Sequence, residues 1–320
     1  AMMPEPVQAA ELLEEDELTL GVDAYGAVIY GARYRENGDD SYGPYVDMAR
    51  GKVYGSKADV GGFMLQVEGA DGNVELLDAV LNMTMLDPVE LNFGFFKTPV
   101  LSELQLSKTR LPMVARTLLN QLVPRRRVGG EAVGTAEAGE VTMTGHIGIF
   151  MPQRGTFDDP DGQLLIGRLL VELPIGLGFH LAYSEHLFEQ NRLEEVPDDA
   201  SAFDRRVVPF DRPLSAAVTY RDKRLTLRAE GVHIFDPPTD DSVNGGYLHA
   251  LYRFGPEAQL QFEPAVAYDI FNRGDLLHRV TGGLNVHFWD TGFYSTVNYQ
   301  LWTTDIVEQH AVLVRLTGVI

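Results

Sequence analysis

The stretch that decides the fold begins at Leu18 and reads LTLGVDAYGAVIY as far as Tyr30. Every second residue in it is apolar or small, including Val22 and Val28, whereas the residues between them include the acidic Asp23. A period of two residues is that of a β-strand, whose side chains point alternately to opposite faces. The stretch therefore predicts a strand with one apolar face and one wetter face.

The same alternation repeats along the whole chain of 320 residues. We expect sixteen strands, at residues 17–34, 44–56, 59–70, 74–86, 88–98, 125–137, 140–153, 163–173, 175–186, 212–222, 224–235, 242–254, 257–270, 276–290, 292–303 and 307–320. Most are long enough to cross a bilayer as a tilted strand, which takes about 9–11 residues. A soluble β-sandwich would alternate in the same way, with its apolar side in a core, so the pattern alone leaves both folds open.

The connections between these strands alternate in length, and this favours a barrel. Long joints are expected at residues 35–44, 99–124, 154–162, 187–211, 236–241 and 272–275, and tight joints at 56–58, 87–88, 138–139, 174, 223, 255–256 and 290–291. Short turns at one rim and long loops at the other are typical of outer-membrane barrels, whereas a Greek-key sandwich mixes the two. The sequence thus predicts an all-β fold, a transmembrane antiparallel β-barrel in a bacterial outer membrane.

Composition excludes several classes of protein. With 26 basic and 46 acidic residues the net charge is −20, which argues against a nucleic-acid partner, because affinity for phosphate backbones comes from clustered Lys and Arg. The chain has no cysteine, so disulfides, thiol catalysis and thiolate metal sites are excluded. Since it has no uncharged apolar run of helix-spanning length, a helical membrane span is excluded as well.

Residues 1–16 form an acidic leader ahead of one barrel domain at 17–320. The leader does not have the basic and then apolar pattern of an export signal, so we expect a chain that is either cytosolic or already cleaved. It is expected to be a short acidic helix at the mouth of the barrel, or disordered.

The third long joint contains the stretch LSELQLSKTRLPMVARTLLNQL, from Leu101 to Leu122. Leucines recur through it, with Lys108, Arg110 and Arg116 between them, so part of it should be helical. A long and partly apolar loop packs against a surface, and in a wide barrel that surface is the inner wall. We therefore expect residues 99–124 to fold inward and narrow the pore; the alternative is a loop that caps the barrel from outside.

Several motifs in this region carry a family resemblance. They are VELLDAVL from Val74, VELNFGFFKTP from Val89, the long joint with its arginines, and PRRRVG from Pro124. Together they resemble the phosphate-selective porin O/P family of bacterial outer membranes, in which an acidic strand, a G-x-F-K-x-P strand end, an inward third loop and a P-x-R-R-x-G strand start follow one another. The specific match covers about Met48 to Gly134.

The resemblance implies a sixteen-stranded trimeric porin for passive uptake, with anion selectivity in some members that arises from inward arginines and lysines. Two features depart from the family. The chain ends in Ile320, where such barrels close with an aromatic residue, and it is shorter than expected, so its loops must be trimmed.

Candidate pore residues follow from the inward loop and the polar face of each strand. We expect a constriction formed by Lys108, Arg110, Arg116, Arg125, Arg126 and Arg127, and a lumen lined by Arg50, Lys52, Asp78, Glu90, Arg168, Arg228, Glu230, Arg279 and Arg315. Other inward positions include Arg221, Arg253, Glu172 and Glu263, and the two signs nearly balance. The expected function is a passive channel for small hydrophilic solutes and ions with weak charge selectivity. The alternative is a channel selective for anions, phosphate or pyrophosphate, in which the basic side chains converge at the waist.

The expected partners are solutes, outer-membrane lipid with lipopolysaccharide, and further copies of the chain. Small residues on the outer face near the start, Ala24, Gly26, Ala49 and Gly51, would allow close approach of another subunit; alternatively, glycine here eases barrel curvature. No cofactor or metal is expected.

The competing class is an enzyme. The sequence has no G-x-S-x-G, H-E-x-x-H or Walker motif. Ser184 lies close to His180 and His186 in sequence, but neighbours on one strand do not make a nucleophile and base oriented by a third group. We therefore do not expect catalysis.

Overall fold

The computed structural model describes residues 10–15, 18–35, 40–57, 59–70, 73–151, 163–187, 212–235, 242–256, 260–273, 275–288, 293–304 and 308–319. The strands are β1 (Ala10–Glu15), β2 (Leu18–Arg35), β3 (Ser41–Lys57), β4 (Gly61–Ala70), β5 (Asn73–Leu86), β6 (Val89–Lys97), β7 (Arg126–Ala138), β8 (Val141–Phe150), β9 (Leu164–Glu172), β10 (Leu177–His186), β11 (Pro213–Arg221), β12 (Leu225–Ile234), β13 (Val243–Tyr252), β14 (Gln261–Arg273), β15 (Asp275–Phe288), β16 (Phe293–Thr303) and β17 (Glu308–Val319). The helical elements are α1 (Ser102–Gln105) and two 3-10 turns, η1 (Lys108–Arg110) and η2 (Leu118–Gln121). Across these described ranges, no helix has both the length and the apolar character needed to cross a membrane.

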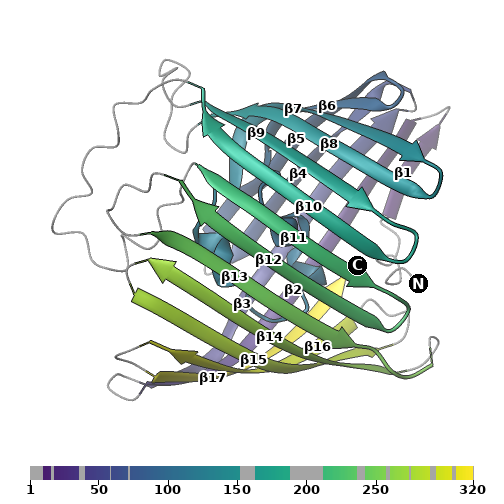
Figure 1. Ribbon diagram of the computed structural model, residues 1–320. Coiled ribbons are helices and arrows are strands. Elements are labelled where there is room, and N and C mark those ends of the chain that lie inside the picture. Colours follow the sequence, from purple (N-terminus) through teal and green to yellow (C-terminus); the bar gives the residue numbers. More distant parts are fainter. Residues whose placement is uncertain are drawn as a thin grey trace.

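Strands β2 to β17 form one closed antiparallel ring (Figure 1). Each pairs with the next along the chain, and β17 returns to pair with β2, where Val314 lies opposite Tyr30. Closure removes the strand edges whose backbone groups would otherwise lie unpaired in hydrocarbon. The sixteen-stranded transmembrane β-barrel that the sequence predicts is confirmed.

One joint differs from its expected length. β14 and β15 remain paired as far as Arg273, which lies opposite Asp275. Two residues further from the turn, Phe271 lies opposite Leu277. The connection expected as a long loop at 272–275 is therefore a tight hairpin, because the cross-strand pairing extends to the ends of both strands.

The leader contributes a seventeenth strand outside the ring. β1 pairs with the beginning of β2, from Leu18 to Val22, whereas β17 reaches β2 only from Tyr25 onwards. The first residues of β2 thus have a free edge, and β1 occupies it. The expected helix is wrong for residues 10–15; the rest of the leader lies outside the described residues.

The two faces of the ring differ as the alternation predicts. On β14, Val266 and Tyr268 are exposed on the outer face, whereas Ala267 and Asp269 face inward and are buried. Large apolar side chains are exposed on the outer face of most strands, including Val28, Leu81, Ile147, Leu181, Leu248, Val297 and Val312. An apolar outer band is what a barrel needs in hydrocarbon.

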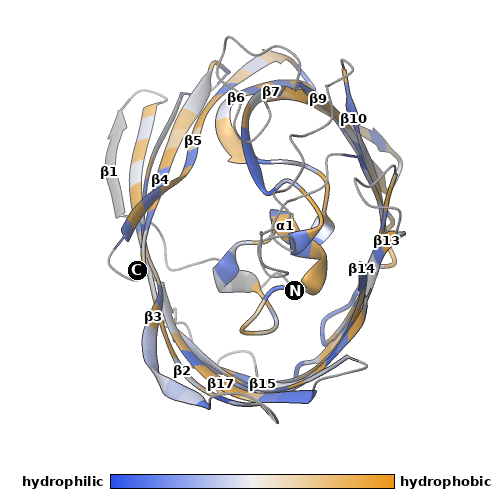
Figure 2. Ribbon diagram, turned by 90° about the vertical axis from the view of Figure 1, so that its left-hand side faces the viewer, coloured by the Kyte–Doolittle hydropathy of each residue, from blue (hydrophilic) through white to orange (hydrophobic). Residues whose placement is uncertain are grey.

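Residues 99–124, here called the inner loop, lie within the ring, and α1 is visible inside it when the barrel is viewed along its axis (Figure 2). The loop has little regular secondary structure: it contains only one turn of α-helix and two 3-10 turns. Its apolar side chains Leu101, Leu104, Leu118, Leu119 and Leu122 pack against a patch of the inner wall formed by Phe150, Leu164, Ile166, Val232, Val243 and Phe271. The inner wall is therefore apolar where the loop covers it, although the sequence predicts the wetter face of the strands to point inward.

Candidate pore constriction

The start of the inner loop is held by a carboxylate of the barrel wall. Glu230, on β12, accepts hydrogen bonds from the backbone N–H groups of Ser102 (2.7 Å) and Glu103 (3.4 Å). The hydroxyls of Ser215 and Tyr247 also donate to it, each at 2.9 Å. A carboxylate accepts such bonds more strongly than a neutral oxygen, so Glu230 fixes the point at which the loop meets β12.

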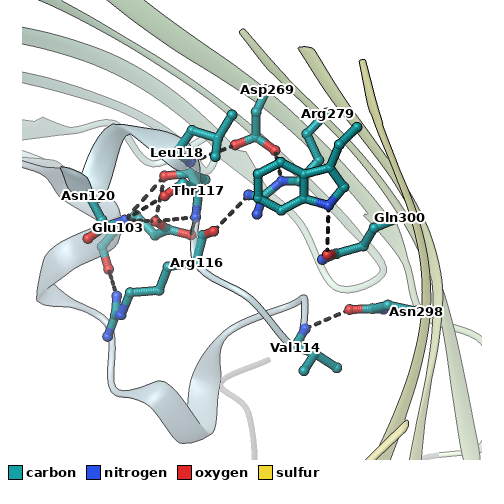
Figure 3. Close-up of polar contacts among 11 residues, drawn as sticks. Glu103, Val114, Arg116, Thr117, Leu118, Asn120, Asp269, Arg279, Asn298 and Gln300 are labelled. Carbon is teal, nitrogen blue, oxygen red and sulfur yellow. Dashed lines mark hydrogen bonds and ion pairs between the residues drawn. The ribbon is translucent and has the colours of Figure 1, made fainter. Parts of the chain in front are cut away.

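A second carboxylate ties the two ends of the loop together. Glu103 accepts hydrogen bonds from the backbone N–H of Thr117 (3.1 Å), its hydroxyl (2.7 Å) and the side-chain amide of Asn120 (Figure 3). Burial raises the pKa of the Glu103 carboxyl, and the hydrogen bond from Thr117 opposes the shift. The Arg116 guanidinium donates to the carbonyl oxygens of Glu103 and Leu106, each at 3.0 Å. The loop is therefore cross-linked within itself.

The far side of the loop is attached to β14 and β15. Asp269 accepts hydrogen bonds from the backbone N–H of Leu118 (3.2 Å) and from Nε of Arg279 (3.0 Å). Arg279 donates in turn to the carbonyl oxygen of Arg116 (2.7 Å). Asp269 and Arg279 therefore bind the loop backbone at two nearby points, the Leu118 N–H and the Arg116 carbonyl (Figure 3).

Further contacts join the middle of the loop to β16, β17 and β3. The backbone N–H of Val114 donates to Asn298 (2.6 Å), and Arg315 donates to the carbonyl oxygens of Val114 (3.4 Å) and Leu111 (3.3 Å). Lys108 forms an ion pair with Asp47 on β3 at 2.7 Å. The loop thus leaves the ring at β6, crosses the lumen and is fastened to the opposite wall.

The six residues expected at the constriction do not meet at one point. Arg116 and Arg125 lie near Arg126. Burial lowers the pKa of Arg116 to about 10; the Glu103 carboxylate opposes this shift and the charge of Arg126 adds to it. Burial, together with the charge of Arg126, also lowers the pKa of Arg125. Lys108 instead pairs with Asp47 on a different wall.

Most of these cations already have partners. Arg125 donates to the carbonyl oxygen of Asn120 (3.1 Å), and Arg126 binds both oxygens of Asp78, at 3.0 and 3.3 Å. Arg127 is buried and donates to the carbonyl oxygen of Arg126 (3.5 Å). Arg110 belongs to η1, and its side chain lies outside the described structure.

Most of the expected lumen residues also form pairs along the wall. Arg50 pairs with Glu68 on β4, and Lys52 pairs with Asp23 on β2 at 2.8 Å. Glu90 accepts a long hydrogen bond of 3.5 Å from Asn82. Arg279 and Arg315 are only 4% and 0% exposed, because the inner loop covers them. These two arginines hold the loop and do not face open lumen.

Three lumen arginines differ from the rest. Among the residues that the structure describes, the guanidiniums of Arg168, Arg221 and Arg228 have no ion pair and no hydrogen bond, whereas the other expected lumen arginines bind either a carboxylate or the inner loop. Two acids on the same wall are engaged elsewhere, since Glu230 holds the loop and Glu263 binds Arg253 at 2.8 Å.

Sequence reasoning missed several residues that organise the loop, among them Glu103, Asn298 and Lys97. Lys97, at the end of β6, donates to the carbonyl oxygens of Gln105 (3.3 Å) and Leu106 (3.0 Å). Lys97 lies in the strand-end motif FFKTP, directly before the loop, and this position is the signal that could have identified it.

The same wall carries the serine and histidines that the enzyme alternative would need. Ser184 is buried, and its hydroxyl has no hydrogen-bond partner among the described residues, so it is not paired with His180 or His186. No cluster of three His, Asp or Glu side chains within the described ranges is arranged to hold a metal ion.

Comparisons with known proteins agree with this geometry at the level of the fold. No protein-family model and no curated protein sequence matches the chain. It is similar to the solved structure of an anion-selective porin from Comamonas acidovorans, with 12% identity, a TM-score of 0.71, and 95% of this chain and 100% of that chain covered. It is also similar to Salmonella typhi OmpF in complex with daunomycin (13% identity, TM-score 0.60, 95% and 99% covered) and to a mutant of Rh. blastica porin (12%, 0.62, 94% and 100%). At these identities the likeness establishes the fold, which is that of the bacterial porins.

Proposed function

We propose that the chain is an outer-membrane porin, a passive diffusion channel for small hydrophilic solutes and ions. The observation that carries the proposal is the inner loop, which crosses a charged lumen inside a ring whose outer face is apolar. A loop fastened across the lumen limits solute size, and the solute gradient alone drives transport. Residues 17–320 act as one domain in this proposal.

Weak charge selectivity is the form of this function that the paired charges support. Arg50 and Lys52 each lie against a carboxylate of the neighbouring strand, and Arg126 on β7 binds Asp78 on β5, two strands away. The field of such a pair falls off quickly in water and ions, so a passing ion experiences little net charge from these walls.

A second candidate is a channel selective for anions such as phosphate or pyrophosphate, as in the porin O/P family that the sequence resembles. The arginines without carboxylate partners, Arg168, Arg221 and Arg228, favour it. They belong to β9, β11 and β12, so in this alternative the selecting residues lie on the wall and not on the inner loop.

The proposed assembly is a homotrimer embedded in outer-membrane lipid and lipopolysaccharide. Ala24 and Gly26 on β2 lie opposite Gly51 and Ala49 on β3. A Cβ added to Gly26 would meet no atom within 4 Å, so this surface is open to a neighbouring subunit.

Reversal potentials in planar bilayers under a salt gradient test the proposal. Weak selectivity predicts stable channels, a small reversal potential and no block by phosphate. A strong anion preference with block at low phosphate would replace it with the second candidate, and the absence of any channel would contradict both.

A further inference from the structure

A groove lies on the outer face of the barrel over β9 to β14, of which β10 to β14 are at the front of Figure 1. Its volume is about 580 Å³, within the ~300–1,000 Å³ typical of ligand pockets. Its floor is made of small residues, Ala216, Ala229, Gly231 and Gly246. Larger side chains border it on both sides, namely Leu169, Phe179, Leu181, Leu248, Tyr268 and Ile270.

The strand register shows how the groove is built. Ala216 lies opposite Gly231 and Gly231 opposite Gly246, so three neighbouring strands present almost no side chain at one level. Leu181 and Ile270 end this row on either side. An apolar trough is therefore open to the membrane between two apolar ridges.

The fold itself does not require these glycines. A Cβ added to Gly231 would meet only the carbonyl oxygen of Gly245, at 3.8 Å, and one added to Gly246 would make ordinary contacts at 3.5 Å or more. Neither glycine has the positive φ that favours this residue. The missing side chains thus leave room on the outside of the barrel.

Polar groups lie directly above the groove, towards the rim that carries the long loops. Two residues closer to this rim, the next row of outward side chains consists of Tyr183, Leu214, His233 and Asn244 on four successive strands. His233 contacts the Asn244 side chain. Arg212 lies at the same rim, where it pairs with Glu185 at 2.8 Å and is about one-third exposed.

We propose that this groove binds one acyl chain of a phosphate-bearing lipid of the outer leaflet, whose phosphate is met by Arg212 and His233. The inference rests on the proposed outer-membrane function. The apolar trough matches an acyl chain at the depth of the hydrocarbon, and an arginine with an imidazole at the rim matches a phosphate.

The position of the groove argues for lipid and against a second copy of the chain. The small-residue surface proposed for subunit contact is on β2 and β3, and Figure 2 shows β3 and β13 on opposite sides of the ring. A closed trimer that uses β2 and β3 leaves the groove facing the bilayer.

The test is native mass spectrometry of the purified chain titrated with diphosphorylated lipid A. The variants G231L and A229L each place a side chain in the trough and should weaken binding of the first lipid by at least about tenfold, because they displace several methylene groups. The matched control is G282L on β15, an outward glycine with no atom within 4 Å of the added Cβ, which should bind as the wild type does. R212Q should weaken binding of lipid A but not of its dephosphorylated form.

Equal lipid binding by wild type, G231L and A229L would overturn the inference, as would cross-linking of two copies through β11 and β12. Channel conductance is recorded on the same proteins. If the wild type forms channels but the groove variants bind lipid as tightly as it does, only the proposed lipid site is contradicted. If the wild type forms no channels, the proposed function is contradicted.

Discussion

Carboxylates inside the barrel act mainly as anchors for the inner loop. Glu230 and Asp269 each accept hydrogen bonds from backbone N–H groups of the loop, and Asp47 pairs with Lys108. An acid that is engaged in this way no longer balances a cation on its own wall. The charge that solutes meet therefore differs from the charge obtained by counting inward residues.

Glu230→Gln should loosen the loop. The substitution removes the negative charge and turns one acceptor into a donor that faces the N–H of Ser102 or Glu103, so we expect a loss of about 1–3 kcal/mol in unfolding free energy. Thermal unfolding followed by circular dichroism measures this, and single-channel recordings should show noisier open states. Ser215→Ala, which leaves the carboxylate in place, is the control; equal behaviour of the two variants would count against the anchor.

Replacing Arg168, Arg221 and Arg228 together by Gln should shift the reversal potential towards cation preference, because these guanidiniums lack carboxylate partners among the described residues. The control is Asp23→Asn with Lys52→Gln, which removes a 2.8 Å ion pair without changing the net charge. If the control shifted the potential as far as the triple variant, the pairing of the lumen charges would be wrongly assigned.

Sequence alone could identify these residues as inward but not give them roles. The parity of a strand places Glu230 and Arg315 on the polar face, and the structure agrees. Their partners, however, lie far away in sequence: Glu230 binds the N–H of Ser102, 128 residues earlier. Such contacts depend on how barrel closure brings the loop to the opposite wall, which no local pattern encodes.

At the scale of elements, the inner loop and the wall beneath it form a core of their own. Leu119 and Leu122 are fully buried against wall residues such as Phe150 and Leu164. The leucine pattern of the loop predicted a partly helical segment with a buried face, but only one turn of α-helix and two 3-10 turns formed. The loop follows the wall to which its backbone is hydrogen-bonded, and this overrides helix propensity.

Leu119→Ala should destabilise the folded barrel by about 2–5 kcal/mol, because it leaves a cavity in a closed core. Thermal unfolding is the measurement, with Leu81→Ala on the outer face of β5 as control, since that side chain is 61% exposed. A control that lost as much stability as Leu119→Ala would place the loop core in doubt.

At the scale of the whole molecule, the period of two and the alternating joints were sufficient to predict the barrel, its strand number and its outer face. The exceptions have local causes. The β14–β15 hairpin is tight because pairing continues to Arg273 and Asp275, and β1 exists because β17 leaves an edge of β2 unpaired.

Gly26→Leu with Gly51→Leu should dissociate the proposed trimer, because the added side chains project from the surface where subunits approach. Light scattering in detergent after size-exclusion chromatography gives the oligomer mass. Gly167→Leu on β9, an outward glycine with equal room, should leave it unchanged. A trimer that survives the double substitution would move the subunit contact to another face.

The most direct test of a water-filled channel is the single-channel current of the purified wild-type chain in a planar lipid bilayer. We predict stepwise, ohmic currents whose unit conductance rises in proportion to salt concentration. A chain that remained monodisperse in buffer without detergent, and that carried no current across the bilayer, would contradict this prediction.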